Sequence, residues 1–227
     1  MTTLRGAVPI AFPLRGEWTA LRTPADRVPT HGTERFGQRY AYDMWRVDRR
    51  AGGYHPASRL RMWVLGVPTR ECYGWGEPVH APFAGTVVRA VEGVPERGWL
   101  HPLRELARLV VLAVTFRPGR AAELAGNHVI IQGGPGSVLL AHLAPGSVAV
   151  REGQLVDEGD LVGRVGHTGN STAPHLHLQL MDAPSPMVAS GLLCSFRELE
   201  ILQGRTWVRA TDVIPRSTDR IRSAMRP

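Results

Sequence analysis

The sequence contains no lysine, so all of its 27 basic residues are arginines, and with 20 acidic residues they give a formal net charge of +7. A carrier domain that bears its cofactor on a lysine side chain is therefore excluded. The arginines are scattered along the chain, without the clustering expected of a nucleic-acid groove. An anionic polymer remains conceivable, because arginine holds planar anions through paired hydrogen bonds, but a generally basic surface and no nucleic-acid partner are predicted.

Cysteines and long apolar runs are also scarce. Cys72 and Cys194 are the only cysteines, so the alternatives are one bridge or, as we expect, two separate buried thiols. No stretch reaches the ~18 apolar residues of a spanning helix. Pro9 and Pro13 interrupt the N-terminal apolar stretch, and no small-residue cleavage site follows it. We therefore expect a cytoplasmic chain; a secreted or wall-associated chain would need an export route that these residues do not reveal.

Glycine and proline are abundant, at 25 and 18 residues, and they favour turns and short strands over long helices. Short apolar runs between glycine-rich turns predict strands at residues 128–132, 138–142, 161–165 and 175–180. A further strand is expected over residues 39–47, and a strand–turn–strand unit over 78–90. Regular short strands of this kind predict a mainly β fold, an antiparallel sandwich or an open barrel.

The 227 residues fit one large domain that carries an insertion. Apolar residues recur at helical spacing from Leu100 to Val110 and predict a helical insertion near 94–125. This helix is expected to cap the sheet; a membrane-interface or partner-binding helix is the alternative. We predict an irregular N-terminal segment (1–36), a β domain (37–182, with a long loop at 48–76) and a C-terminal extension (183–227) with a frayed arginine-rich tail.

Two histidines lie one residue apart on a predicted strand. His175 and His177 therefore project from the same face, because strand side chains alternate. Two such imidazoles can bind a metal together, or one can bind it while the other transfers protons. Satisfied surface histidines are the simpler alternative.

Asp43 lies on the strand predicted over 39–47, among aromatic residues. Burying its carboxylate costs roughly several kcal/mol unless the charge is paired or bound to a metal. An ion pair with Arg39 or Arg46 would satisfy it as well as a metal would.

Several motifs together resemble the core of the lysostaphin-type endopeptidases. They follow one another in the order Glu77-Pro-Val, Ala81-Pro-Phe-Ala-Gly85, Gly126-Asn-His-Val-Ile-Ile131, Leu140-Ala-His-Leu143, Val156-Asp-Glu-Gly-Asp160, Gly166-His-Thr-Gly169 and Pro174-His-Leu-His177. The resemblance extends from about residue 40 to about residue 180. It implies the family's β fold, a bound zinc ion and a peptide or peptidoglycan-like substrate.

The resemblance also implies residue roles. Asp43 and His177 correspond to zinc ligands, whereas His142 and His175 correspond to the two histidines that hold the attacking water or stabilise the oxyanion. The oligomeric state is not predicted.

One position departs from the family pattern. The usual third ligand lies four residues before the aspartate, where this chain has Arg39, and arginine cannot bind a metal because it stays protonated. A divergent branch of the family has a histidine upstream of a Gln-Arg-Tyr-Ala-x-Asp motif, which resembles Gln38 to Asp43 here, so His31 is the expected replacement. We predict a zinc endopeptidase; the alternative is a catalytically degenerate module of the same fold that binds a peptide or protein.

Overall fold

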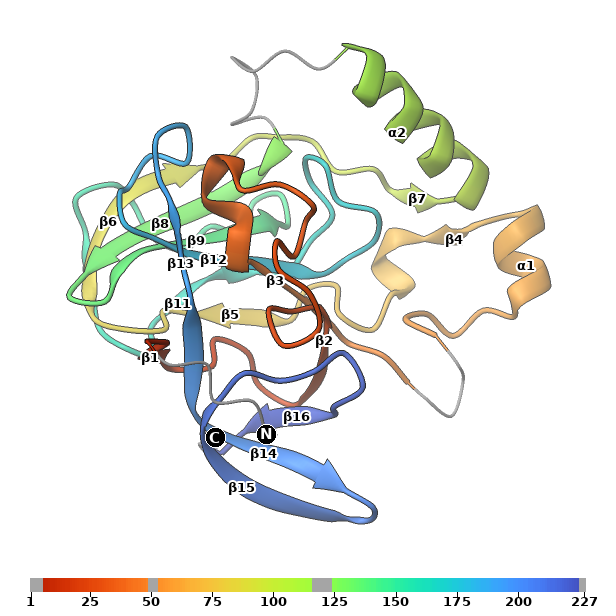
Figure 1. Cartoon of the computed structure of the whole chain (residues 1–227). Helices are drawn as coiled ribbons and strands as arrows, with labels where there is room; N and C mark the ends of the chain where they lie inside the picture. The colour runs from red at the N-terminus through yellow and green to blue at the C-terminus, as the bar shows by residue number, and fades with distance from the viewer. Residues whose placement is uncertain (1–5, 49–52, 116–123, 225–227) are drawn as a thin grey trace.

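The computed structural model describes residues 6–48, 53–115 and 124–224 (Figure 1). The fold is mainly β, as predicted. The strands are β1 (Val8–Ile10), β2 (Glu17–Arg22), β3 (Tyr42–Trp45), β4 (Val67–Pro68), β5 (Pro78–His80), β6 (Gly85–Val91), β7 (Trp99–Leu100), β8 (Asn127–Gly133), β9 (Gly136–Leu143), β10 (Leu155–Val156), β11 (Leu161–Arg164), β12 (Leu176–Met181), β13 (Gly191–Leu192), β14 (Cys194–Gln203), β15 (Thr206–Val213) and β16 (Ile221–Ser223). The helices are α1 (Arg59–Val64) and α2 (Pro102–Thr115), with 3-10 helices η1 (Arg35–Tyr40) and η2 (Thr69–Glu71). No described helix is long and apolar enough to span a bilayer.

A large sheet organises the described chain. Its strands follow the order β1-β14-β16-β2-β3-β12-β9-β8-β6-β10, with β13 beside β12 and β15 beside β14. The pairs are antiparallel except β1 with β14, which makes the sheet mixed rather than purely antiparallel. The parallel pair is allowed because most of the chain connects these two strands. Strands β3 and β12 lie side by side near the middle of the order.

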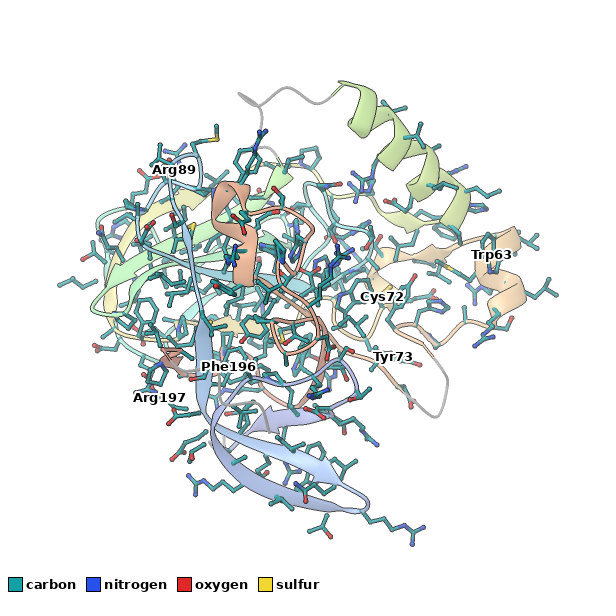
Figure 2. The ribbon with its side chains drawn as sticks, in the orientation of Figure 1. Trp63, Cys72, Tyr73, Arg89, Phe196 and Arg197 are labelled. Carbon is teal, nitrogen blue, oxygen red and sulfur yellow. The ribbon has the colours of Figure 1, made fainter. Side chains whose placement is uncertain are left out.

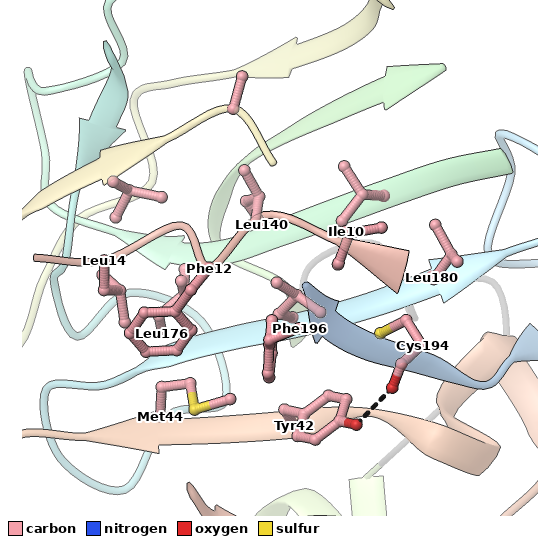
Figure 3. Close-up of a cluster of buried hydrophobic side chains, with 14 of the residues drawn as sticks. Ile10, Phe12, Leu14, Tyr42, Met44, Leu140, Leu176, Leu180, Cys194 and Phe196 are labelled. Carbon is pink, nitrogen blue, oxygen red and sulfur yellow. Dashed lines mark hydrogen bonds between the residues drawn. The ribbon is translucent and has the colours of Figure 1, made fainter. Parts of the chain in front are cut away.

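The core lies on one face of this sheet, where the two-stranded β5–β11 sheet and the N-terminal segment cover it (Figure 3). On β12, Leu176 and Leu178 are fully buried in the core, whereas His177 and Gln179 project from the opposite face. On β3, Tyr42 likewise enters the core, where its hydroxyl donates a 2.6 Å hydrogen bond to the Cys194 carbonyl (Figure 3). Its neighbour Asp43 faces the opposite side of the sheet. Both cysteines are free and buried, as expected.

The N-terminal segment is more ordered than predicted. Residues 1–36, expected to be irregular, contribute β1 and β2, and β2 pairs with β16 and β3. Trp18 and Ala20 anchor β2 in the core, but the surrounding prolines and glycines hide this short strand in the sequence. The strand predicted over 39–47 is shorter because η1 occupies 35–40, where Phe36 and Gly37 have φ of 61° and 71°.

One further expectation is corrected. Residues 48–76, expected to be a long loop, contain α1, whose first turn is capped where the Ser58 hydroxyl accepts a hydrogen bond from the Arg61 N–H. The strand–turn–strand unit predicted over 78–90 is present as β5 and β6, but these two strands do not pair with each other, since β5 pairs with β11 and β6 with β8 and β10. The turn residues are engaged elsewhere: the Ala81 N–H donates to the Asp160 carbonyl at 2.8 Å.

The predicted insertion contains α2, preceded by β7, and its residues 116–123 lie outside the described chain. The C-terminal extension carries β13 to β16. Its tail is not frayed at 221–223, because buried Ile221 pairs with Ile201 and Trp18. The boundaries at 36/37 and 182/183 stay a prediction, although strands from all three parts pair within one sheet.

Candidate active site

Asp43 and His177 face each other across neighbouring strands. His177 on β12 is in register with Asp43 on β3 and with Ala141 on β9. This pairing brings His177 Nδ1 to 2.9 Å from Asp43 Oδ1. Both side chains are almost completely buried. The β register alone therefore brings these two side chains together.

His31 reaches the same point from the loop that follows β2. Its Nε2 lies 3.2 Å from Oδ1 and 3.1 Å from Oδ2 of Asp43. The loop is held because the Thr30 N–H donates to the Arg39 carbonyl and the Thr30 hydroxyl donates to the Gln38 carbonyl. Potential ligand atoms of His31, Asp43 and His177 all lie within 4.8 Å of one another. The three residues form the only candidate metal cluster among the described residues.

The hydrogen bonds on the far side of His177 decide which of its nitrogens carries the proton. Gln179 donates from its amide nitrogen to the Phe36 carbonyl at 2.7 Å, so its amide oxygen faces His177. That oxygen accepts from Nε2–H of His177 at 3.0 Å. The other nitrogen, Nδ1, is left with a lone pair directed at Asp43.

The same reasoning applies to His31. The Thr30 hydroxyl donates its hydrogen to the Gln38 carbonyl. Its oxygen therefore acts as the acceptor for Nδ1–H of His31 at 2.9 Å. The Nε2 lone pair of His31 then points at Asp43. Two imidazole lone pairs and a carboxylate converge without an intervening donor, and such a cluster requires a cation or a proton between its members.

The pKa values follow from this crowding. Burial alone would raise the pKa of Asp43, but the neighbouring His175, His177 and His31 hold it well below its usual range. Burial lowers the pKa of His31. Burial also acts to lower the pKa of His177, but the contact with Asp43 outweighs it and raises the pKa, because a proton between the two groups relieves the convergence.

His142 and His175 complete the wall beside this cluster. His175 Nε2 is 3.5 Å from Asp43 Oδ1, and its Nδ1–H donates to the Ala173 carbonyl at 2.7 Å. His142 donates from Nδ1 to the Thr168 carbonyl at 2.9 Å, and its ring centre is 4.9 Å from that of His175. Both rings therefore turn an unprotonated Nε2 away from their anchoring carbonyls.

The backbone and surroundings of these two rings are unusual. His142 has a φ of 65°, a conformation that non-glycine residues seldom adopt and that is concentrated at functional sites. Burial, followed by the neighbouring His175 and His177, lowers the pKa of His142 well below its usual value. The Trp45 ring stacks on His175 at 5.0 Å with an interplanar angle of 5°, which fixes the orientation of that imidazole.

The arginines do not behave as the sequence suggested. Arg39 pairs with Glu34 and donates to the Tyr40 hydroxyl, away from the cluster, and Arg46 pairs with Glu77. The arginine beside Asp43 is instead Arg22 on β2, whose Nε is 3.3 Å from Oδ2.

The predicted insertion is tied to the loop that carries His175. Glu105 on α2 accepts hydrogen bonds from Arg97 Nε at 3.2 Å and Arg108 Nε at 3.0 Å, and we call these three residues the insertion clamp. Both arginines also donate to the Ser171 carbonyl, at 2.6 Å and 3.0 Å. The Ser171 hydroxyl lies 3.2 Å from His175 Nδ1. The clamp thus supports the segment that orients a predicted catalytic side chain.

A groove of about 900 Å³ runs over the site. His31, Asp43, His142, His175 and His177 all line it. The floor beyond them is apolar and comes from the outward faces of β6, β8 and β9, and the far wall is formed by residues 184–187. A groove with an apolar floor and polar groups gathered at one end suits an extended peptide.

Two further histidines lie near the site, one in the groove and one buried behind it. His128 lines the groove, whereas His167 is fully buried and bonds to Ser171 and Arg97. Sequence reasoning missed Arg22, Thr30 and Gln179. Only Gln179 carried a signal, because it follows His177 by two residues on the same strand face.

Parts of this chain are similar to known peptidases. Residues 109–188 match the model of peptidase family M23. Over this stretch the chain is similar to family M23 peptidases. The matched stretch includes His142, His175 and His177 but not His31 or Asp43. The roles of all five residues, and the divergent branch, stay predictions.

Among curated relatives, the peptidoglycan DD-endopeptidase ShyA of Vibrio cholerae is 38% identical over 65 residues, which are 29% of this chain and 15% of that protein. Among solved structures, the catalytic domain of lysostaphin from Staphylococcus simulans is 25% identical, with a TM-score of 0.34 over 57% of this chain and 81% of that one. Helicobacter pylori Csd3 is 18% identical, with a TM-score of 0.38 over 78% and 32% of the two chains.

Proposed function

We propose that this chain is a zinc-dependent endopeptidase that hydrolyses short peptides of the peptidoglycan cross-link type. Zinc would be held by His31, Asp43 and His177, and His142 and His175 would be the catalytic histidines. The observation that carries the proposal is the convergence of two imidazole lone pairs on the Asp43 carboxylate, with each imidazole proton engaged on the far side.

The donor set suits zinc. Two imidazole nitrogens and one carboxylate oxygen are the ligands of many catalytic zinc sites, which keep a fourth position open. Tetrahedral bonds of 2.0–2.2 Å would separate the ligand atoms by roughly 3.4 Å. The separations of 2.9–3.2 Å between the Asp43 oxygens and the two histidines need only a small expansion.

Bound zinc supplies a Lewis acid that polarises the scissile carbonyl and lowers the pKa of water. The chain's own residues supply proton transfer. His142 stays neutral at neutral pH, since its pKa lies well below the usual value, so its Nε2 can accept a proton from an attacking water. His175, held by Trp45 and the Ala173 carbonyl, would present its Nε2 to the developing oxyanion and could donate there once that nitrogen has taken up a proton.

The substrate class is supported by the groove and by the similarity to peptidase family M23. An apolar floor beside the polar end fits a peptide whose side chains are small or aliphatic. The relative named as a peptidoglycan DD-endopeptidase, which is 38% identical over 65 residues, supports a cross-link peptide as substrate. Action on such a substrate would require the chain to reach the cell wall.

One observation favours the alternative, a catalytically degenerate module that binds peptide. Arg22 Nε at 3.3 Å from Asp43 offers a cation that neutralises the carboxylate without a metal. However, the Arg22 side chain is 55% exposed and therefore largely hydrated, and it leaves the two histidine lone pairs unsatisfied.

The metal content of purified protein, reconstituted with zinc and desalted, tests the proposal. The wild type should retain about one zinc per chain, and both His31→Ala and Asp43→Ala should lose it. His175→Ala should keep the metal but lose cleavage of a cross-linked peptide, and His80→Ala, remote from the groove, should change neither. A wild type without zinc would favour the binding module, and stoichiometric zinc without cleavage of any cross-link peptide would refute the endopeptidase.

A further inference from the structure

Helix α2 is inverted relative to an ordinary surface helix. Its charged residues Glu105 and Arg108 face the protein, where they join the insertion clamp. Its outward face instead carries Leu103, Leu106 and Val110, which are 58%, 59% and 57% exposed. A helix of a soluble protein normally turns such an apolar stripe toward the core. An exposed apolar stripe of this kind marks a surface that binds another molecule or a membrane.

Helix α1 continues the same feature. It approaches α2, and both lie at one side of the molecule (Figure 1). Its Leu60, Trp63 and Val64 are 75%, 59% and 62% exposed, while Met62 is buried. Figure 2 shows Trp63 on α1. Half of the exposed large hydrophobic side chains in the described chain lie on α1, β7 and α2. We call these outward side chains of α1 and α2 the helical patch.

The exposed charges on the two helices of the helical patch are of one sign. Arg59 and Arg61 on α1 and Arg104 on α2 are exposed. The two helices contain a single carboxylate, Glu105, which is turned inward to the clamp. Glu71 is 3.8 Å from Arg61, a distance at which an exposed pair contributes little. A ligand of this surface must therefore present an apolar region to the leucine, valine and tryptophan side chains. It must also present negative charge to the arginines around them.

We propose that the helical patch docks the protein on an anionic lipid bilayer. Leucine and valine side chains would enter the acyl boundary, Trp63 would lie at headgroup depth, and the arginines would contact lipid phosphates. Helices with an apolar face, interfacial tryptophan and flanking arginines bind bilayers in the interface plane. The patch does not include the groove, so docking leaves the groove open.

Co-sedimentation of the full chain with vesicles tests this proposal. Vesicles of phosphatidylglycerol and phosphatidylcholine should bind the wild type, and phosphatidylcholine alone should bind it far less. Leu103→Glu combined with Leu106→Glu should weaken binding by more than about tenfold, because two buried leucines contribute that much or more. Leu155→Glu is the matched control: Leu155 is 79% exposed on β10, outside the patch, and its replacement should change nothing.

A salt titration separates the two contributions. Arg59→Gln with Arg61→Gln should reduce binding to anionic vesicles and flatten its salt dependence. Circular dichroism establishes that each variant is folded. Equal binding by wild type and the leucine variant would overturn the proposal. It would also be overturned if vesicles failed to bind the wild type while the leucine variant abolished self-association, since a second copy would then cover the patch. None of these readouts depends on zinc or on cleavage.

Discussion

Glu105→Gln is the substitution that most directly tests how the insertion supports the site. The carboxylate accepts from Arg97 and Arg108, and its side chain is only 12% exposed. Glutamine keeps the shape and one acceptor but removes the charge that both guanidinium groups face. The insertion clamp should therefore weaken. The Ser171 carbonyl, which accepts hydrogen bonds from both arginines, should then be held less firmly.

The magnitude follows from the pKa. Burial alone would raise the pKa of Glu105, but His167, Arg97 and Arg108 lower it from 4.5 to about 2. That difference corresponds to about 3 kcal/mol of native-state stabilisation. Because the two arginine side chains are 29% and 24% exposed, solvent screening reduces this to roughly 1–3 kcal/mol. For a chain of this size the melting temperature should fall by roughly 2–12 °C.

The lowered pKa of Glu105 also predicts how its contribution to stability changes with pH. A carboxylate whose pKa is lower in the folded state stabilises the fold fully above its unfolded pKa, and this stabilisation is lost as the pH falls toward 2. The gap in melting temperature between wild type and Glu105→Gln should therefore be full at pH 6 and narrower at pH 3.

Thermal unfolding monitored by circular dichroism at these pH values measures the gap. Glu71→Gln is the matched control, since Glu71 is 41% exposed and 3.8 Å from Arg61, and it should change stability by no more than about 0.5 kcal/mol. The reasoning is refuted if Glu105→Gln behaves like Glu71→Gln, or if the gap does not change with pH.

Three further predictions concern the core and the metal centre. Gln179→Leu should weaken zinc affinity roughly 10–100-fold, measured by chelator competition, because His177 loses the acceptor that fixes its tautomer; Gln132→Leu on the exposed side of β8 should not. Tyr42→Phe should cost about 1–3 kcal/mol in denaturant unfolding, because it leaves the buried Cys194 carbonyl without its donor. Arg39→Ala should leave zinc content unchanged, and a loss of metal would show that this arginine supports the centre.

Part of the fold and site was readable because strand periodicity encodes it. His175 and His177 share the outward face of β12, and the intervening Leu176 enters the core. The glycine-rich turns marked the strands of the central sheet, and helical spacing from Leu100 to Val110 marked α2. These features depend on neighbours within a few residues, so a local pattern suffices to predict them.

The rest depends on contacts between distant segments. Arg22 lies beside Asp43 only because β2 pairs with β3, and the short β2 has no clear alternation of its own. The insertion clamp joins Arg97 and Arg108 to a serine more than 60 residues later. Nothing in the local sequence of either partner predicts such a pairing, because the loop conformation that creates it is set by the whole fold.

Arg39 and His31 are best understood together. An arginine directed at Asp43 from the ligand position would place a permanent cation where a metal binds, since its guanidinium stays protonated. In this chain Arg39 instead turns to Glu34 and Tyr40, and its own carbonyl accepts the Thr30 N–H that holds the loop carrying His31. The residue that replaces the usual ligand thus anchors, through its backbone, the segment that delivers another imidazole. Removing the Arg39 side chain should therefore spare the centre, whereas changing the path of residues 30–39 should dismantle it.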